Sequence, residues 1–288
     1  MGIRKLLLPI TGSAAGEAAL ATALDLARLW SAHVLALHVR VDSRDVAPLA
    51  GEGLSGAMIE DMMSATDAEG LARATKVRAL FAAAVAARGI PFGEPRPGEH
   101  GPTASFAAVT GREDDLIAQQ ARLSDLTVVP HAESPDESSS SDALHAALFE
   151  SRRPVLVAPP HAPAQIGQRI CVAWNGTAEA TSAVGAALPW LARAEAVRIL
   201  AADEYHRRGP AAADLAEYLA LHDILAEVVT FRPVERDVGA GLLQAAAEFG
   251  ADLLVMGAYS QSRLRQMLLG GVTRHVLANA ALPVLMSR

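Results

Sequence analysis

The chain has 288 residues, and its formal net charge is −7 at pH 7. This acidic balance argues against a broad nucleic-acid footprint, which needs clustered Lys and Arg. Apolar residues make up 51% of the chain but aromatic residues only 4%. That composition favours α/β layers built from Ala, Val, Leu and Ile, and the length suits two domains of about 140 residues.

The single cysteine and the lack of long apolar runs limit the cellular compartments in which the protein is expected. Cys171 lies in an apolar run, where a lone cysteine is more often a small core residue than a nucleophile. No stretch approaches the roughly eighteen apolar residues that span a bilayer. The N-terminal apolar run after Arg4 and Lys5 is too short for a signal peptide. We therefore expect a cytoplasmic protein that has no membrane partner.

The first elements form a crossover unit. Residues 6–10 are a candidate buried strand, residues 14–30 carry apolar residues at helical spacing, and residues 34–41 are a second strand. His33 and His38 lie in or beside that second strand. With no second ligand at metal spacing, each is expected to be a hydrogen-bonded core or edge residue.

A long helix follows a polar loop. Residues 42–56 mix Gly, Ser, Pro and charges and predict a loop, whereas residues 57–88 have a long amphipathic pattern that ends at Gly89, a suitable C-cap. Met58, Met62 and Met63 fall early in this helix. Methionines of this kind line a partner groove or pack within the protein, and packing is the favoured interpretation.

The rest of the first half predicts two strands, 104–109 and 125–130, around a helix at 113–123 whose first turn is acidic. Residues 131–142, HAESPDESSSSD, contain no glycine and several acidic residues, so we expect a solvated loop that repels phosphate. A short helix at 144–149 and a strand at 154–157 complete this half.

The second half repeats the first. Residues 169–173 correspond to 5–9, and residues 251–256 correspond to 124–129. We predict one domain at 1–158, a Pro- and Ala-rich linker at 159–168, and a second domain at 169–288. Each is expected to be a five-stranded parallel sheet with helices on both faces. The expected second-half strands are 170–174, 197–201, 226–231, 253–256 and 283–286, and the expected helices are 178–193, 211–222, 241–249 and one ending at Asn279.

The end of the chain has a pattern suited to phosphate. A short apolar strand leads into Gly257, and a basic and polar segment then runs to the pair Gly270-Gly271, after which helical spacing resumes. Free amide hydrogens and the positive end of a helix dipole attract an anion at such a point. The alternative is that these glycines only turn the chain, and the spacing by itself leaves both interpretations open.

This segment resembles the C-terminal signature of the universal stress protein family, which reads Gly, two residues, Gly, nine residues, Gly, then Ser or Thr. Gly257 and Gly270 match, whereas Ser260 replaces the second glycine and Gly271 replaces the hydroxyl residue. Val272 and Thr273 continue as in family members. The resemblance covers nearly the whole chain, is strongest from residue 168 onward, and implies a Rossmann-like fold in both halves.

The resemblance implies a ligand for the second half. Nucleotide-binding members wrap this loop around the phosphates of ATP, so the implied ligand is ATP, AMP or another adenine nucleotide, with Mg²⁺ as its companion ion. Asn175 stands where such members carry an Asp that meets the adenine, and an amide still offers a donor and an acceptor. Thr11 holds that place in the first half and is the weaker candidate. Arg263 and Arg265 either neutralise phosphate or keep an exposed segment soluble. The predicted cofactor-binding residues are Asn175, Ala201, Gly257, Ser260, Arg263, Gly270, Gly271, Val272 and Thr273.

Three functions stay open at this point. The resemblance implies a stress-response protein that senses or stores a nucleotide in its second domain, while the first domain is degenerate. One alternative is an interaction scaffold with protein partners. The other is a slow ATP hydrolase, which is less favoured because the sequence has no readable catalytic triad, metal-ligand cluster or P-loop lysine. We also expect an internal pseudo-dimer through residues 155–157 and 284–286, with further homodimerisation left open.

Overall fold

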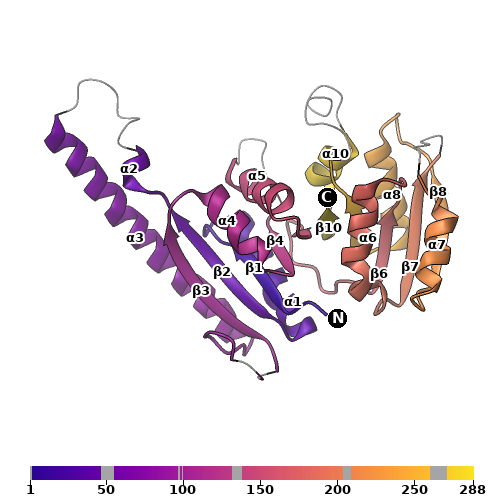
Figure 1. The fold of residues 1–288 in the computed structure, drawn as a ribbon, viewed down its shortest axis with the longest axis horizontal. Helices are drawn as coiled ribbons and strands as arrows, with labels where there is room; N and C mark the ends of the chain where they lie inside the picture. The colour runs from indigo at the N-terminus through magenta and orange to yellow at the C-terminus, as the bar shows by residue number, and fades with distance from the viewer. Residues whose placement is uncertain are drawn as a thin grey trace.

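The computed structural model describes residues 2–46, 55–96, 98, 100–131, 138–203, 209–259 and 271–288 (Figure 1). Strands and helices alternate through both halves. The strands are β1 (Lys5–Pro9), β2 (His33–Arg40), β3 (Thr103–Thr110), β4 (Leu126–Val129), β5 (Val155–Val157), β6 (Arg169–Ala173), β7 (Ala196–Ala202), β8 (Ala226–Phe231), β9 (Leu253–Gly257) and β10 (Val284–Ser287). The helices are α1 (Ala14–Trp30), α2 (Ser43–Val46), α3 (Gly56–Ala87), α4 (Glu113–Arg122), α5 (Ser138–His145) with its π-helical continuation η2 (Ala146–Glu150), α6 (Ala178–Leu191), α7 (Ala212–Ala220), α8 (Val238–Phe249) and α10 (Val272–Asn279).

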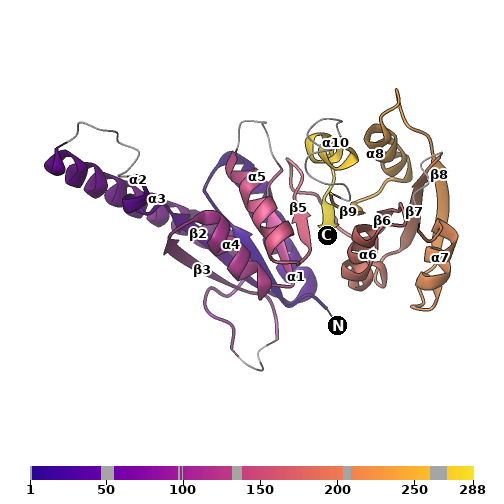
Figure 2. The same ribbon diagram turned by 45° about the horizontal axis from the view of Figure 1, so that its top comes forward.

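The ten strands within the described residues join one sheet in the order β3-β2-β1-β4-β5-β10-β9-β6-β7-β8. Pairing is parallel within each half, as predicted. The halves meet through an antiparallel pair in which Leu156 of β5 lies opposite Leu285 of β10. The predicted internal contact between the two last strands is therefore confirmed, and it makes one continuous sheet across the molecule (Figure 2).

Side chains alternate between the two faces of this sheet, as a period of two requires. Leu6 and Leu8 contribute to one apolar cluster, whereas Leu7 between them contributes to the other. Helices α1, α3, α6 and α7 cover the first face, and α4, α5, α8 and α10 cover the opposite face. Each cluster includes residues of both halves, so the two halves share their packing layers.

Aromatic contacts reinforce the junction on each face. Trp30 at the end of α1 meets Trp190 of α6 edge to face, with ring centroids 5.1 Å apart. On the opposite face, Tyr259 after β9 lies 5.1 Å from the ring of Phe149, and the guanidinium of Arg288 lies 4.3 Å from that ring. Tyr259 thereby ties the end of β9 to the first half.

Most predicted elements are confirmed, but two loops were wrong in part. Within the predicted loop 42–56, Ser43–Val46 form α2, because the Asp42 carboxylate accepts from the backbone N of Arg44 at 3.0 Å and starts a turn. Within the predicted loop 131–142, helix α5 begins at residue 138. Its later residues Ala143 and Leu144 are buried, so packing against the sheet outweighs the weak helix preference of the serines. Residues 47–54 and 132–137 lie outside the described residues.

Candidate functional site

A cavity of about 400 Å³ lies at the carboxyl ends of the second-half strands. In an open parallel sheet, ligands bind beyond the carboxyl ends where the strand order reverses, and here that point lies between β6 and β9. The predicted residues Asn175, Ala201, Gly257 and Val272 all line this cavity. The other described residues lining it are Ala173, Trp174, Leu200, Ala202, Asp203, Gly209, Pro210, Ala211, Ala212, Thr230, Phe231, Val238, Leu242 and Met256.

Asn175 is oriented by the turn that starts α6. Its Oδ1 accepts from the backbone N of Thr177 at 3.2 Å and from the Thr177 hydroxyl at 2.9 Å. The same hydroxyl accepts from the backbone N of Ala180 and so caps α6. Because a backbone N–H can only donate, these bonds fix which end of the amide is oxygen. Within the described part of the chain, the Asn175 Nδ2 keeps no protein partner and remains a donor at the cavity wall.

Among the described residues, the backbone groups of Ala202 at the end of β7 pair with no neighbouring strand. The pairing of β7 with β6 ends at Leu200, whose carbonyl accepts from the backbone N of Trp174 at 2.9 Å. On the other side, the backbone N of Asp203 donates to the carbonyl of Phe231 in β8. Since alternate residues of a strand direct their backbone groups to opposite sides, the N–H and C=O of Ala202 face away from β8. The N–H donor and the C=O acceptor of Ala202 therefore lie side by side, next to Ala201, which the sequence analysis predicts to bind the ligand.

A glycine contact holds a loop across the ends of β6 and β7. A Cβ at Gly209 would lie 2.0 Å from the carbonyl oxygen of Gly176, and Gly176 itself has a φ of +71°. The Trp174 Nε1 donates to the carbonyl of Pro210 at 3.0 Å. Any side chain at Gly209 would force the two backbones apart and open this side of the cavity.

Gly257 has a packing role that does not depend on a ligand. A Cβ at this residue would lie 2.4 Å from the backbone N of Ala180 and 2.6 Å from the carbonyl carbon of Glu179. Strand β9 thus passes directly against the first turn of α6. The glycine is required for that close approach, so its match to the family signature does not by itself indicate phosphate.

The remaining predicted residues surround the start of α10. Gly271 is the N-cap residue and supplies no side-chain cap, so the first-turn amide hydrogens lack the usual capping oxygen. Thr273 is buried, and its hydroxyl accepts from the backbone N of Tyr259 at 3.4 Å. This hydrogen bond joins the end of β9 to the first turn of α10. Ser260, Arg263 and Gly270 lie outside the described residues.

Sequence reasoning missed several polar groups at this rim. Asp203 lines the cavity, and its carboxylate lies 3.8 Å from the Nε of Arg232. Its position just after a predicted strand was a usable signal, because carboxyl ends of strands converge on the crevice. Gly209 and Pro210 could not be found in this way, because their role comes from contacts with a distant turn.

A second polar pair joins α8 to α10 beside the cavity. The Asp237 carboxylate accepts from the backbone N of Gly239 at 2.7 Å and of Ala240 at 3.2 Å, and the Nδ1 of His275 lies 2.6 Å from it. Partial desolvation raises the pKa of Asp237, but the two backbone donors and His275 together lower it overall. Asp237 therefore acts as an ionised cap that also holds α10 in place.

Residues 167–288 match the model of the universal stress protein family. The second half of the chain is therefore a universal stress protein domain. A universal stress protein from Archaeoglobus fulgidus DSM 4304 is 16% identical, with a TM-score of 0.70 over 99% of this chain and 98% of that one. A putative universal stress protein from Pseudomonas aeruginosa UCBPP-PA14 is 15% identical, with a TM-score of 0.50 over 99% of this chain and 93% of that one. These likenesses show that the Rossmann-like fold extends over both halves. No curated protein matches the sequence.

The first half has side chains where the second half has its cavity. By strand pairing, His38 occupies the place of Ala201, because Leu37 lies opposite Pro9 as Leu200 lies opposite Ala173. His38 is buried, its Nδ1 lies 2.8 Å from the carbonyl oxygen of Ile10, and its ring stacks on Phe106 at 6.5 Å. The prediction that His38 is a hydrogen-bonded core residue is confirmed.

Helix α3 covers the corresponding first-half turn. A Cβ at Gly12 would lie 2.9 Å from a methyl group of Val77, so α3 packs where the loop of Gly209 passes in the second half. Thr11, the weaker predicted candidate, donates its hydroxyl to Ser13 at 3.2 Å. In the first half, His38 and Val77 thus lie where the second half has Ala201 and the backbone of Gly209.

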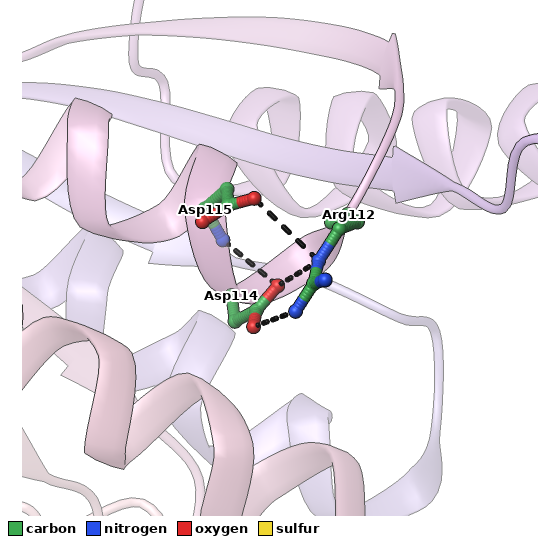
Figure 3. A network of polar contacts seen from close by, with 3 residues as sticks. All are labelled: Arg112, Asp114 and Asp115. Carbon is green, nitrogen blue, oxygen red and sulfur yellow. Dashed lines mark hydrogen bonds and ion pairs between the residues drawn. The ribbon is translucent and has the colours of Figure 1, made fainter.

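Another hollow in the first half, of about 490 Å³, is strongly acidic. Figure 3 shows Arg112 between Asp114 and Asp115, with N–O distances of 2.8 and 3.5 Å. The Arg112 hydrogen bond holds the pKa of Asp114 below its ordinary value. Burial, together with Asp142 and Asp114, raises the pKa of Glu113. This concentration of carboxylates disfavours a phosphate group there.

Two further kinds of site, a metal centre and a membrane span, are absent from the described residues. Among the residues that the structure describes, no group of three or more His, Cys, Asp or Glu side chains is arranged to hold a metal ion. Across the same ranges, no helix has both the length and the apolar character needed to cross a membrane.

Proposed function

We propose that the second domain binds an adenine nucleotide and that the first domain does not. The observation that carries this proposal is the contrast at one strand position. Ala201 leaves a cavity of about 400 Å³ in the second domain, whereas His38 fills the same place in the first. That volume falls in the usual range for small-ligand pockets, roughly 300–1,000 Å³.

The polar groups at the cavity fit an adenine ring. Adenine offers a ring-nitrogen acceptor beside its exocyclic amino donor. The N–H and C=O of Ala202 and the Nδ2 of Asn175 supply complementary groups, while Leu200, Met256 and Leu242 give an apolar lining. The uncapped first turn of α10, bordered by Val272, would hold the phosphates through backbone amides and the helix dipole. A bound Mg²⁺ would add charge neutralisation for those phosphates.

Nucleotide sensing or storage is favoured over turnover. The described lining residues include one carboxylate, Asp203, and no Lys, His or Cys. Phosphoryl transfer depends on placed cations and an oriented nucleophile. We therefore propose a stress-response protein that reports nucleotide occupancy to a partner, and we do not expect it to hydrolyse ATP.

The test is isothermal titration of the full chain with ATP, with and without Mg²⁺. We expect one site per chain, because the first-domain pocket is filled. Ala201→His copies the first domain and should weaken binding at least tenfold. Ala213→His adds the same side chain at an exposed position of α7 and should leave the affinity unchanged.

The outcomes separate the open functions. Binding without phosphate release supports the sensor, and phosphate release supports the hydrolase. A wild-type chain that shows no heat at millimolar ATP would reject the proposal in favour of the scaffold. Two sites per chain, or an Ala201→His variant that binds normally, would show that the assigned cavity is wrong.

A further inference from the structure

Helix α3 is much longer than its counterpart in the second half. It has 32 residues, whereas α7, which packs on the same side of the sheet beside β7 and β8, has 9. At Gly70, helix α3 passes the side chain of Arg40, the last residue of β2. Residues 56–69, the α3 overhang, therefore run about 21 Å beyond the strand end at 1.5 Å per residue. Figures 1 and 2 both show this part of α3 projecting past the sheet.

The α3 overhang keeps an apolar stripe although no strand lies beneath it. Ala74, Val77 and Phe81 are buried on the sheet, and Met63 and Ile59 lie farther back on the same helical face, beyond Gly70 and Thr66. Met63 and Ile59 are only half-buried. Further exposed apolar side chains border the stripe, with Met58 54% and Leu71 59% accessible.

A hollow opens at the base of the α3 overhang. It is lined on the helix by Met63, Asp67 and Leu71 and on the other side by residues 40–44 without Val41, which include the start of α2, and by the end of β3. Its charges balance, because Arg40 and Arg44 are matched by Asp42 and Asp67. Asp42 and Arg44 pair at 2.8 Å. An apolar side chain can therefore enter beside Met63 without meeting a net charge.

The negative charge of the α3 overhang favours a partner with positive charge. Glu60, Asp61, Asp67 and Glu69 lie within it, and its sequence has no Lys or Arg before Arg73. A second copy of this helix would place carboxylates against carboxylates, which disfavours self-pairing. A helix with an apolar face and basic flanks is complementary on both counts.

We propose that the α3 overhang is a docking surface for a basic amphipathic helical segment of a partner protein. Methionine side chains suit this role, since they are flexible and polarisable and adapt to partners of different shape. The surface is remote from the second-domain cavity, and the proposal does not depend on nucleotide binding. It gives the first domain, whose ligand space is filled, an interaction role of its own.

The test uses a labelled eighteen-residue Leu/Lys peptide with an amphipathic helical pattern, followed by fluorescence anisotropy on the full chain. A scrambled peptide of equal composition controls for charge. We expect the amphipathic peptide to bind at least tenfold more tightly than the scrambled one. Met62→Gln with Met63→Gln should remove most of that difference, and Glu60→Lys with Asp67→Lys should weaken binding and its salt dependence.

The matched control is Leu221→Gln with Leu225→Gln, which changes two other apolar residues that are 85% and 88% accessible. This variant should bind like the wild type. Equal binding of both peptides, no binding at all, or equal losses in the control variant would overturn the proposal. Sedimentation showing a dimer that the methionine variant dissociates would overturn it in favour of a second copy as the occupant.

Discussion

Replacement of Gly257 by alanine tests the closest contact between β9 and α6. The added Cβ would lie 2.4 Å from the backbone N of Ala180, far inside contact distance, and the obstacle is a helix backbone that cannot rotate away. Overpacking of this kind costs about 1–3 kcal/mol, and a backbone obstacle places the cost near the upper end. With an unfolding entropy of about 2.1 cal/mol/K per residue, roughly 3 kcal/mol lowers the Tm of the whole chain by about 5 °C.

The assay is thermal unfolding followed by circular dichroism without any ligand. Gly185→Ala is the matched control, because this glycine lies within α6 and a Cβ there meets nothing within 4 Å. That variant should gain about 0.5–1 kcal/mol from better helix propensity and so change Tm in the opposite direction. A Gly257→Ala protein that melts within about 1 °C of the wild type would refute the close approach. Its glycine would then need a ligand-based explanation.

Three further predictions concern a cap, the domain junction and the cysteine. Asp237→Ala should lose about 1 kcal/mol of N-cap stabilisation in urea unfolding near pH 7. Because the folded-state pKa of Asp237 is lowered, that loss should shrink as the pH falls below the ordinary carboxyl pKa near 4; a loss that persists in acid would point to another cause. Trp190 is 2% exposed at the junction, so Trp190→Ala should cost about 3–5 kcal/mol in the same assay, more than Trp30→Ala, whose ring is only half-buried. Burial raises the pKa of the Cys171 thiol to about 12, so mass spectrometry should find no iodoacetamide adduct in the native protein near pH 8 and one adduct in guanidinium chloride; rapid native labelling would contradict the buried placement.

The regular elements could be predicted because their signals are local and repeated. The helix Ala14–Trp30 has the bounds that its apolar spacing gives, and the buried strand runs of both halves lie where their apolar residues place them. The beginning of α5 was missed because four serines carry little helical signal. Its helix is stabilised by contacts of Ala143 and Leu144 with a sheet that the local sequence does not reveal.

The candidate site was predictable only where it follows strand ends. Asn175 and Gly257 were found because each comes directly after or at the end of an apolar run, and these ends converge in a parallel sheet. The contact of Gly209 with Gly176 joins segments more than thirty residues apart, so no local pattern encodes it. The sequence also did not reveal that His38 takes the place of Ala201, since this correspondence depends on the register between two strands.

The antiparallel seam of β5 with β10 has a consequence for biosynthesis. Val157 is translated well before its neighbour Val284 exists, and at roughly 5–20 residues per second the delay is on the order of ten seconds. Throughout that interval, β5 of the nascent first half is an unpaired edge strand. Its free backbone groups can pair with other chains on the same polysome, which favours aggregation. Because β5 has only three residues, a strand from another chain can form few hydrogen bonds with it before β10 is synthesised.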